Sequence, residues 1–244
     1  MRRLAAIDIG TNTILMLVAD IGEDGILFPL KDLERTTRLG RGLAETGHLH
    51  PDSLSKSYEV IDGYLTVCRD VGVDKVIMAG TSALREAENT KDLLNLVQER
   101  HGLTIQILSG EEEARLSYLT VDREMGGDSP LLVLDIGGGS TEIIIGDRGR
   151  ISVLRSLDLG AVRLTERFLG SDPVVEEEFQ QMMAHIFRDL RSLAITPPKR
   201  VVGLGGTIST LSILRTLSNR FCSTRERPRS IDSRSRAFPE TEPM

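Results

Sequence analysis

Residues 7–13 read IDIGTNT, and residues 134–143 read LDIGGGSTEI, so the opening of the first segment recurs in the second. In both places an apolar run (residues 4–9 and 131–136) ends in Asp-Ile-Gly, and a second apolar run follows a short polar turn. Strand, tight turn and strand is the pattern of a β-hairpin. The repeat predicts two related α/β domains, each a mixed sheet with flanking helices, that face each other across a cleft.

Helices and further strands are predicted around both hairpins. Apolar residues at three- and four-residue steps predict an amphipathic helix over residues 52–71. Thr90 is the predicted cap of a helix that stops at Gly102, and Asp172-Pro173 is predicted to open a long helix. Three successive glutamates favour the start of a helix over residues 111–122, because negative charge is stabilised at a helix N-terminus. The other strands are expected at residues 13–19, within 26–37, and at 73–79, 104–108, 141–145, 151–157 and 200–204.

Composition divides the chain into a first domain over residues 1–124, a second over 125–218 and a tail over 219–244. A polar, glycine-rich stretch at residues 124–130 marks the boundary between the domains. The tail is rich in Arg, Ser and Pro and lacks apolar periodicity, which predicts disorder. Because the tail interrupts a helix, we interpret it as the mark of a truncation or frameshift that leaves the second domain incomplete.

Charge and composition exclude several classes of protein. The formal net charge is −6 and aromatic residues make up 4% of the chain, which argues against a nucleic-acid polymer as partner. Cys68 and Cys222 form no metal spacing or disulfide framework, so a reducing cytoplasm is expected. No apolar run approaches the ~18 residues of a membrane span, and no secretory signal is recognised.

The two glycine-rich turns are candidate phosphate-binding loops. Backbone amides can surround a densely anionic chain only where the backbone approaches closely and adopts positive φ, which glycine permits. An acidic residue at the end of each first strand can orient a divalent metal that bridges phosphates. The alternative is a pair of structural turns whose aspartates cap local amides. The candidates are Asp8, Gly10, Thr11 and Asn12 in the first loop, and Asp135, Gly137, Gly138, Gly139, Ser140, Thr141 and Glu142 in the second.

Three further segments carry candidate chemistry. A glutamate of Ser109-Gly110-Glu111-Glu112-Glu113 is a candidate base for an attacking water, although the three glutamates equally suit a helix start. Arg85 is a candidate phosphate clamp, since guanidinium pairs with two phosphate oxygens at once. The turn at Gly205, Gly206 and Thr207 suits a distal phosphate, a ribose or a base, or is a plain strand-to-helix turn. The histidines show no spacing that predicts a zinc site.

Taken together and in order, seven motifs resemble the exopolyphosphatase / guanosine pentaphosphate phosphohydrolase (Ppx/GppA) family. That family belongs to the actin, sugar kinase and heat-shock ATPase superfamily. The resemblance covers roughly residues 3–217. The motifs are IDIGTNT at 7–13, RLGRGL at 38–43, GTSALREAEN at 80–89, SGEEEARLSY at 109–118, LDIGGGSTEI at 134–143, LGAVRLTERFL at 159–169 and VVGLGGTISTL at 201–211.

The resemblance implies two ribonuclease H-like domains around a phosphate-binding cleft and a Mg²⁺-dependent phosphoanhydride hydrolase. It implies that Glu113 is the catalytic base and that Arg85 faces phosphate. Asp135 and Glu142 match acidic residues linked to catalysis and metal, with Asp8 as a further metal ligand. Family members continue for dozens of residues beyond the Gly-Gly-Thr segment, so the second domain here is expected to lack core elements and to expose apolar surface.

Four functions stay open at this level. The leading hypothesis is an exopolyphosphatase that releases inorganic phosphate from the end of polyphosphate. The alternatives are guanosine pentaphosphate 5′-phosphohydrolase activity, a truncated protein that binds phosphate or nucleotide without turnover, and a kinase of the same superfamily. The oligomeric state is open, with a homodimer among the alternatives.

Overall fold

The computed structural model describes residues 1–125, 129–193, 195–196 and 198–221. Met1–Ser209 forms one compact unit, and a second unit begins at Thr210. The two sheets described below both lie in the first unit. The predicted disorder of the tail beyond residue 221 lies outside the described residues, as does Cys222. The predicted domain bounds at residues 124 and 218 stay a prediction.

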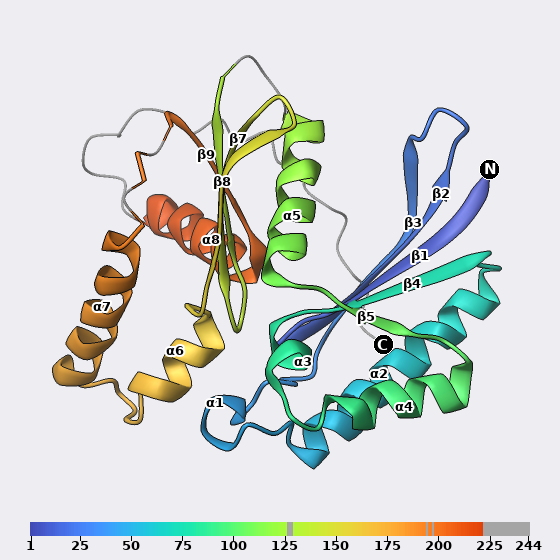
Figure 1. Cartoon of the computed structure of the whole chain (residues 1–244), viewed down its shortest axis with the longest axis horizontal. Helices are drawn as coiled ribbons and strands as arrows, with labels where there is room; N and C mark the ends of the chain where they lie inside the picture. The colour runs from blue at the N-terminus through green and yellow to red at the C-terminus, as the bar shows by residue number, and fades with distance from the viewer. Residues whose placement is uncertain (126–128, 194, 197, 222–244) are drawn as a thin grey trace. The chain divides into compact units, whose positions relative to one another are not determined.

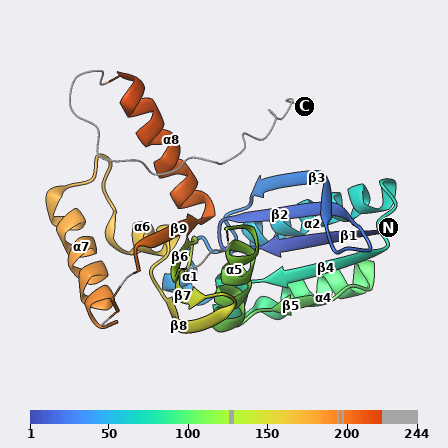
Figure 2. The same ribbon diagram turned by 90° about the horizontal axis from the view of Figure 1, so that it is seen from above.

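The first sheet has five strands in the order β3-β2-β1-β4-β5 (Figure 1). Alternation places Ala5, Ile7 and Ile9 of β1 on one face, because successive strand side chains point to opposite faces. Helices α2 and α4 cover that face and share one core with the strands (Figure 2). The bounds are β1 Arg2–Ile9, β2 Thr13–Ile21, β3 Leu27–Thr36, β4 Lys75–Gly80, β5 Ile105–Ile107, α2 Pro51–Asp70 and α4 Thr90–His101.

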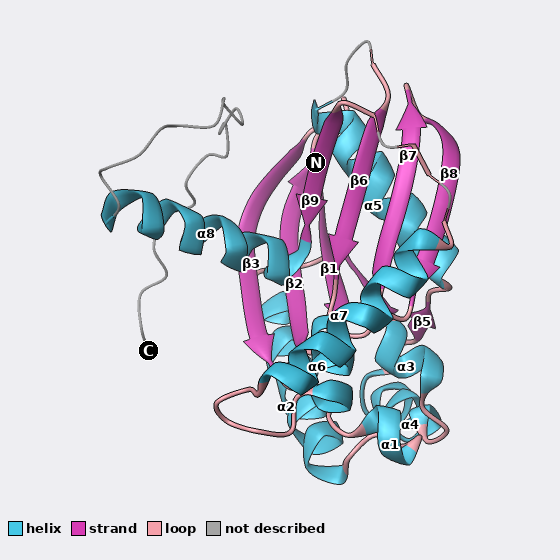
Figure 3. Cartoon of the chain, turned by 90° about the vertical axis from the view of Figure 1, so that its left-hand side faces the viewer, coloured by secondary structure: helices cyan, strands magenta, loops and turns pink. Residues whose placement is uncertain are grey.

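The second sheet has four strands in the order β8-β7-β6-β9, which run side by side in Figure 3. One face packs against α5 through Ala114, Tyr118 and Val121. A Cβ built on Gly146 would lie 2.4 Å from Tyr118 Cζ, so glycine there makes room for the ring. The bounds are β6 Leu131–Ile136, β7 Thr141–Asp147, β8 Arg150–Leu157, β9 Arg200–Leu204 and α5 Gly110–Met125.

Strand order and pairing repeat between the sheets, which confirms the predicted pair of related mixed α/β halves. In each half the first strand pairs antiparallel with the second and parallel with the fourth of that half, β4 or β9. Both hairpin turns are closed alike: Gly10 donates its amide to Thr13 O and Gly137 donates its amide to Ser140 O, each at 3.0 Å. In the described residues the second sheet has no counterpart of β5, in keeping with the predicted incomplete second domain.

Two predicted helix starts were wrong. Thr90 is the first residue of α4 and not its cap, because its hydroxyl donates back to Leu84 O and Ala87 O at 2.7 and 2.9 Å. Helix α7 begins at Glu176 and not at Asp172-Pro173, because Glu178 accepts the amides of residues 170 and 171 and holds them in a turn of their own. The predicted stop at Gly102 is confirmed by its left-handed conformation (φ 67°).

The remaining helices are three short ones, the longer helix α7, and one helix that enters the second unit. They are α1 Leu43–Thr46, α3 Ser82–Glu86, α6 Ala161–Phe168, α7 Glu176–Arg191 and α8 Gly205–Phe221. Helix α8 thus continues to residue 221, into the predicted tail. Apolar side chains are exposed on α7, β9 and α8, as expected for a second domain that lacks core elements, and they include Phe187, Val201 and Leu211. Within the described residues, no helix has the length and apolarity that a membrane crossing requires.

Candidate active site

The two predicted phosphate loops lie against each other. A Cβ built on Gly138 would lie 3.1 Å from Thr11 Cβ, and one built on Gly139 would lie 2.2 Å from Ser82 Oγ and 2.9 Å from Thr11 Oγ1. Only residues without a side chain allow the second loop to approach so closely. The structure therefore brings together the loops that the sequence places 127 residues apart, counting from Asp8 to Asp135 (135 − 8).

Neighbouring backbone holds each loop in place. The first loop is fixed by the segment after β3, since Asn12 O accepts the amides of Thr37 and Arg38 at 3.0 and 2.9 Å. The Asn12 side chain donates to Thr13 Oγ1 at 3.3 Å. The second loop rests on Gly160, where a Cβ would lie 2.2 Å from Gly138 O. Both loops are thus set by hydrogen bonds and close backbone packing.

One aspartate lies near the end of the first strand in each half, Asp8 in β1 and Asp135 in β6, and their charges interact. Asp135 is half-buried and its Oδ2 accepts a hydrogen bond from Ser117 of α5 at 2.7 Å. Asp8 keeps access to solvent. Partial desolvation by the surrounding protein, and then the negative charge of Asp135, raise the pKa of Asp8 to about 6. A positive group beside the two carboxylates would relieve their mutual repulsion.

Glu142 is a buried carboxylate at the start of β7. In the backbone register of the hairpin, it lies opposite Asp135 of β6. Burial raises the pKa of Glu142, and hydrogen bonds from Ser156 and Ser140 oppose that rise. The Ser156 hydroxyl donates to Glu142 Oε1 at 2.7 Å. A Cβ built on Gly110 would lie 2.6 Å from Ser156 Oγ, so the start of α5 lies against the same serine.

The three successive glutamates of α5 have three different surroundings. Glu112 accepts the Ser109 amide and hydroxyl at 2.8 and 2.9 Å while its own amide donates to Ser109 Oγ, which is a reciprocal helix cap. Glu111 is exposed. Glu113 is half-buried, with a side chain that is 20% exposed. The structural role that suits a helix start therefore falls to Glu112, which leaves Glu113 available for chemistry.

Glu113 pairs with Arg85 among the other carboxylates. Arg85 Nη1 donates to Glu113 Oε2 at 3.3 Å and to Leu108 O at 2.7 Å. Burial, together with the negative charges of Glu142 and Asp8, raises the pKa of Glu113 to about 7, and Arg85 opposes that rise. A carboxyl group that titrates near neutral pH can accept a proton from water. The geometry thus joins the predicted base and the predicted clamp in one place.

The donor chemistry of the site suits a hard divalent cation. In the described part of the chain, no three His, Cys, Asp or Glu side chains lie close enough to hold a metal by themselves. Mg²⁺ however keeps several waters and binds through one or two carboxylates together with substrate phosphates. Asp8 and Asp135, whose charges interact, fit that demand. Glu142 is enclosed by two serines, and its metal-binding role stays a prediction.

The third glycine segment, residues 205–207, lies at the end of the second sheet that carries Asp135. Strand β9 pairs with β6 up to Asp135, opposite Leu204, and Gly205 follows with φ +87°. A Cβ on Gly205 would lie 2.7 Å from Ile136 O and 3.1 Å from Asp135 Oδ1. Gly206 and Thr207 continue as the first turn of α8, and their phosphate-binding role stays a prediction.

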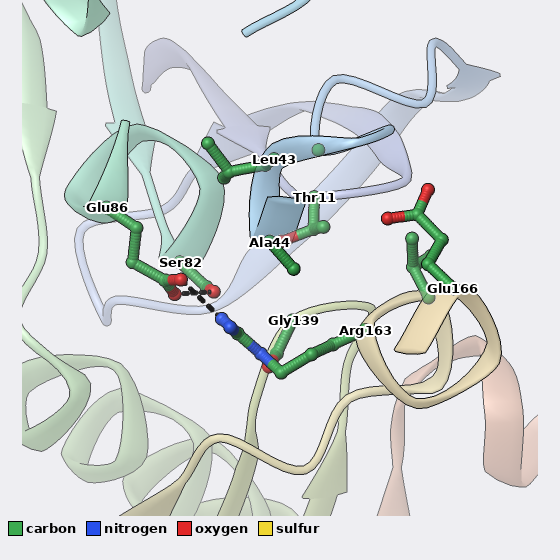
Figure 4. A pocket seen from close by; sticks show the side chains of 10 residues that line it. Thr11, Leu43, Ala44, Ser82, Glu86, Gly139, Arg163 and Glu166 are labelled. Atoms are coloured by element: carbon green, nitrogen blue, oxygen red, sulfur yellow. Dashed lines mark hydrogen bonds and ion pairs between the residues drawn. The ribbon is translucent and has the colours of Figure 1, made fainter. Parts of the chain in front are cut away.

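A small pocket beside the loops contains residues that sequence reasoning missed (Figure 4). Arg163 of α6 donates from Nε to Gly139 O at 2.8 Å, and its Nη2 pairs with Glu86. Glu166 accepts the Gly42 amide at 3.1 Å. Membership of the quoted motifs GTSALREAEN and LGAVRLTERFL was the only signal for these residues. The lining is Thr11, Gly40, Leu43, Ala44, Ser82, Glu86, Gly139, Val162, Arg163 and Glu166.

Comparison with known proteins shows which family this chain belongs to. The Ppx/GppA phosphatase family matches residues 17–231. Exopolyphosphatase 2 of Mycobacterium tuberculosis is 36% identical over 227 residues, which span 87% of this chain and 70% of that protein. The crystal structure of the Aquifex aeolicus Ppx/GppA family member aligns with TM-score 0.71 at 34% identity, over 88% of this chain and 69% of that one. An exopolyphosphatase from Cytophaga hutchinsonii aligns with TM-score 0.78 at 26% identity, over 91% and 73% of the two chains.

Proposed function

The chain belongs to the Ppx/GppA phosphatase family and is a phosphoanhydride hydrolase, and we propose that it releases inorganic phosphate from the end of inorganic polyphosphate. The observation that supports this most is the position of Glu113. It is the one glutamate of its run that pairs with Arg85 and interacts with Glu142 and Asp8. A base beside a guanidinium and two phosphate loops is what phosphoanhydride hydrolysis requires.

The loops supply the donors for the phosphate chain. We assign phosphate contacts to the loops at residues 10–12 and 137–141, because short glycine-rich turns direct several N–H groups at one small volume. The amides of Gly10 and Gly137 close the turns, so the donors assigned to phosphate are the amides of residues 11–12 and 138–140. Gly205, Gly206 and Thr207 are assigned to a more distal phosphate. Since Thr11 lies against Gly138 and Gly139, a phosphate between the loops requires them to separate there.

Glu113 accepts the proton of the attacking water as the water adds to the terminal phosphorus, and the bond to the bridging oxygen breaks. Arg85 has two tasks in this proposal. It orients Glu113 through the 3.3 Å contact, and it neutralises charge on the phosphate oxygens as the bond breaks. Asp8 and Asp135 would hold Mg²⁺, which supplies positive charge to the phosphates when bound. Ser117 keeps the Asp135 carboxylate oriented.

Phosphate release from long-chain polyphosphate, with and without Mg²⁺, tests the proposal. We expect the enzyme to release inorganic phosphate as the product, and only when Mg²⁺ is present. Competition between the two substrates distinguishes them. If guanosine pentaphosphate inhibits hydrolysis of polyphosphate more strongly than polyphosphate ends at equal concentration inhibit hydrolysis of the nucleotide, the nucleotide is the preferred substrate.

A cytoplasmic location belongs to the same proposal. It follows from the expected absence of disulfides, and Cys68 is a buried free cysteine.

A folded protein that binds polyphosphate without releasing phosphate is the rival function. Circular dichroism melting of the same preparation decides whether the chain is folded. A cooperative melt without any phosphate release would favour the rival and contradict the hydrolase. Formation of a phosphorylated acceptor together with ADP would instead favour a kinase.

A further inference from the structure

We propose that Arg163 is a second phosphate-binding arginine of the polyphosphate site, and that the Glu86 carboxylate occupies the position of a phosphate oxygen on Arg163 when no substrate is bound. This inference rests on the proposed function, since it names a further contact of the same substrate. Neither residue belongs to the constellation around Glu113. Both line the pocket beside the loops (Figure 4).

Arg163 is fixed at the rim of the second phosphate loop. Its Nε donates to Gly139 O at 2.8 Å, which anchors the guanidinium to the loop backbone. The side chain is only 19% exposed, so its position is set by surrounding protein. The anchor uses one edge of the planar group and leaves the terminal nitrogens to meet an anion. An arginine held in this way is already placed for any phosphate that reaches Gly139.

Glu86 now fills the position of that anion. One of its oxygens accepts the Ser82 hydroxyl at 2.5 Å, and the other accepts Arg163 Nη2. A phosphate group accepts the same kinds of hydrogen bond from serine and from guanidinium, with more charge and more acceptor oxygens. Ser82 also meets the second loop, because a Cβ on Gly139 would lie 2.2 Å from Ser82 Oγ. Ser82 and Arg163 therefore both reach Gly139 and both bind the same carboxylate.

The energetic balance favours exchange of the carboxylate for a phosphate. The Arg163–Glu86 ion pair is 19% and 31% exposed, so water still screens it in part, and its formation immobilises two side chains. A polyphosphate carries charge on every unit and gains the serine and arginine donors together. Glu86 is 31% exposed while it is paired with Arg163, so its carboxylate has access to water when a phosphate displaces it. A simple structural tie between α3 and α6 is the other reading of the same contacts, and Glu166 with Gly42 is an example of such a tie nearby.

The two readings predict opposite signs for Glu86. If Glu86 competes with phosphate, its removal frees Arg163 and strengthens binding. If the pair is a structural tie, removal of either partner breaks it and has the same effect. Arg163→Gln and Glu86→Gln therefore separate the readings without any need for a structure of the complex.

Calorimetric titration with inorganic tripolyphosphate and Mg²⁺ provides the measurement, in a Glu113→Gln background that prevents turnover. We expect Arg163→Gln to weaken binding about 10- to 100-fold, as loss of a charge-assisted contact does. We expect Glu86→Gln to tighten binding about three- to tenfold, since the competing anion pair is of the weak, partly exposed kind. Arg167→Gln removes an exposed charge from the same helix and should leave binding unchanged.

Each other outcome has a definite meaning. Equal weakening by Arg163→Gln and Glu86→Gln, or binding unchanged by Arg163→Gln, overturns the inference while the proposed function stands. A failure of the parent protein to bind tripolyphosphate overturns both. If Arg163→Gln does not fold by circular dichroism, Arg163→Lys keeps the charge but loses the Nε anchor. It should then weaken binding severalfold, and wild-type binding in Arg163→Lys together with no tightening in Glu86→Gln overturns the inference.

Discussion

Replacement of Glu113 by glutamine should stabilise the folded protein at alkaline pH. The folded-state pKa of Glu113 is about 7 against an ordinary value of 4.5, because burial and neighbouring carboxylates disfavour the charged form. A raised carboxyl pKa contributes stability that is fully present below pH 4.5 and is lost as pH rises through about 7. Above that range the native protein must carry a charge that it disfavours. Glutamine has a similar shape and carries no charge, so it removes this penalty.

The size of the effect follows from the same pKa values. The difference, about 7 minus 4.5, is about 2.5 pH units. Each unit corresponds to about 1.36 kcal/mol, which gives an upper value of about 3.4 kcal/mol at pH 8.5. Because the Glu113 side chain keeps 20% exposure, we expect a gain in the free energy of unfolding of roughly 2 kcal/mol. At pH 4 the gain should be near zero.

Urea denaturation of wild type and Glu113→Gln at pH 4, 6 and 8.5 measures this. The two proteins should have the same free energy of unfolding at pH 4, differ by more than half of the full effect at pH 6, and differ fully at pH 8.5, because the penalty accumulates between pH 4.5 and about 7. Glu111→Gln is the control, because Glu111 is exposed on the same helix turn, and its effect should be small at every pH. A destabilised Glu113→Gln at pH 8.5, or a gain that does not depend on pH, would refute the assigned environment of Glu113.

Three further outcomes follow from the same geometry. The wild-type rate of phosphate release should rise with pH and reach half its plateau near pH 7, because the base must be deprotonated; a flat profile from pH 5.5 to 8.5 would contradict this. Arg85→Gln should lower kcat and move that rise above pH 7, because Arg85 lowers the pKa of Glu113; an unmoved midpoint would exclude the contact. Gly160→Ala should destabilise the fold by about 2–3 kcal/mol, because its Cβ meets Gly138 O at 2.2 Å. Gly63→Ala in helix α2, with open space around it, should instead stabilise by about 0.5–1 kcal/mol, and equal melting of the two variants would contradict the packing.

Periodicity was sufficient to predict most elements of this fold. Strong apolar runs that end at a glycine turn predicted β6 at its observed bounds and β1 within two residues at its start. Both failures at helix starts arose from side-chain hydrogen bonds that no local pattern reveals. Thr90 turns back to Leu84, and Glu178 reaches back to residues 170 and 171. Such contacts depend on the path of the chain before the helix.

The candidate site was predictable in its parts and less so in its assembly. The Asp-Ile-Gly repeat predicted two hairpins, and their turns indeed share one closing hydrogen bond pattern. Spacing alone could not decide among Glu111, Glu112 and Glu113, because the choice depends on Ser109 as a cap and on Arg85 from another helix. The pairing of Glu86 with Arg163 joins residues 77 apart in sequence and has no local signature.

The central claim is that Glu113 readies water for attack on the end of a polyphosphate bound by both loops. Initial rates of phosphate release from long-chain polyphosphate, at pH 8 with saturating Mg²⁺, test it most directly in wild type, Glu113→Gln and Glu111→Gln. The account predicts a loss of ~10²–10⁴-fold in kcat for Glu113→Gln and a wild-type rate for Glu111→Gln. A folded Glu113→Gln protein that releases phosphate at the wild-type rate would contradict it.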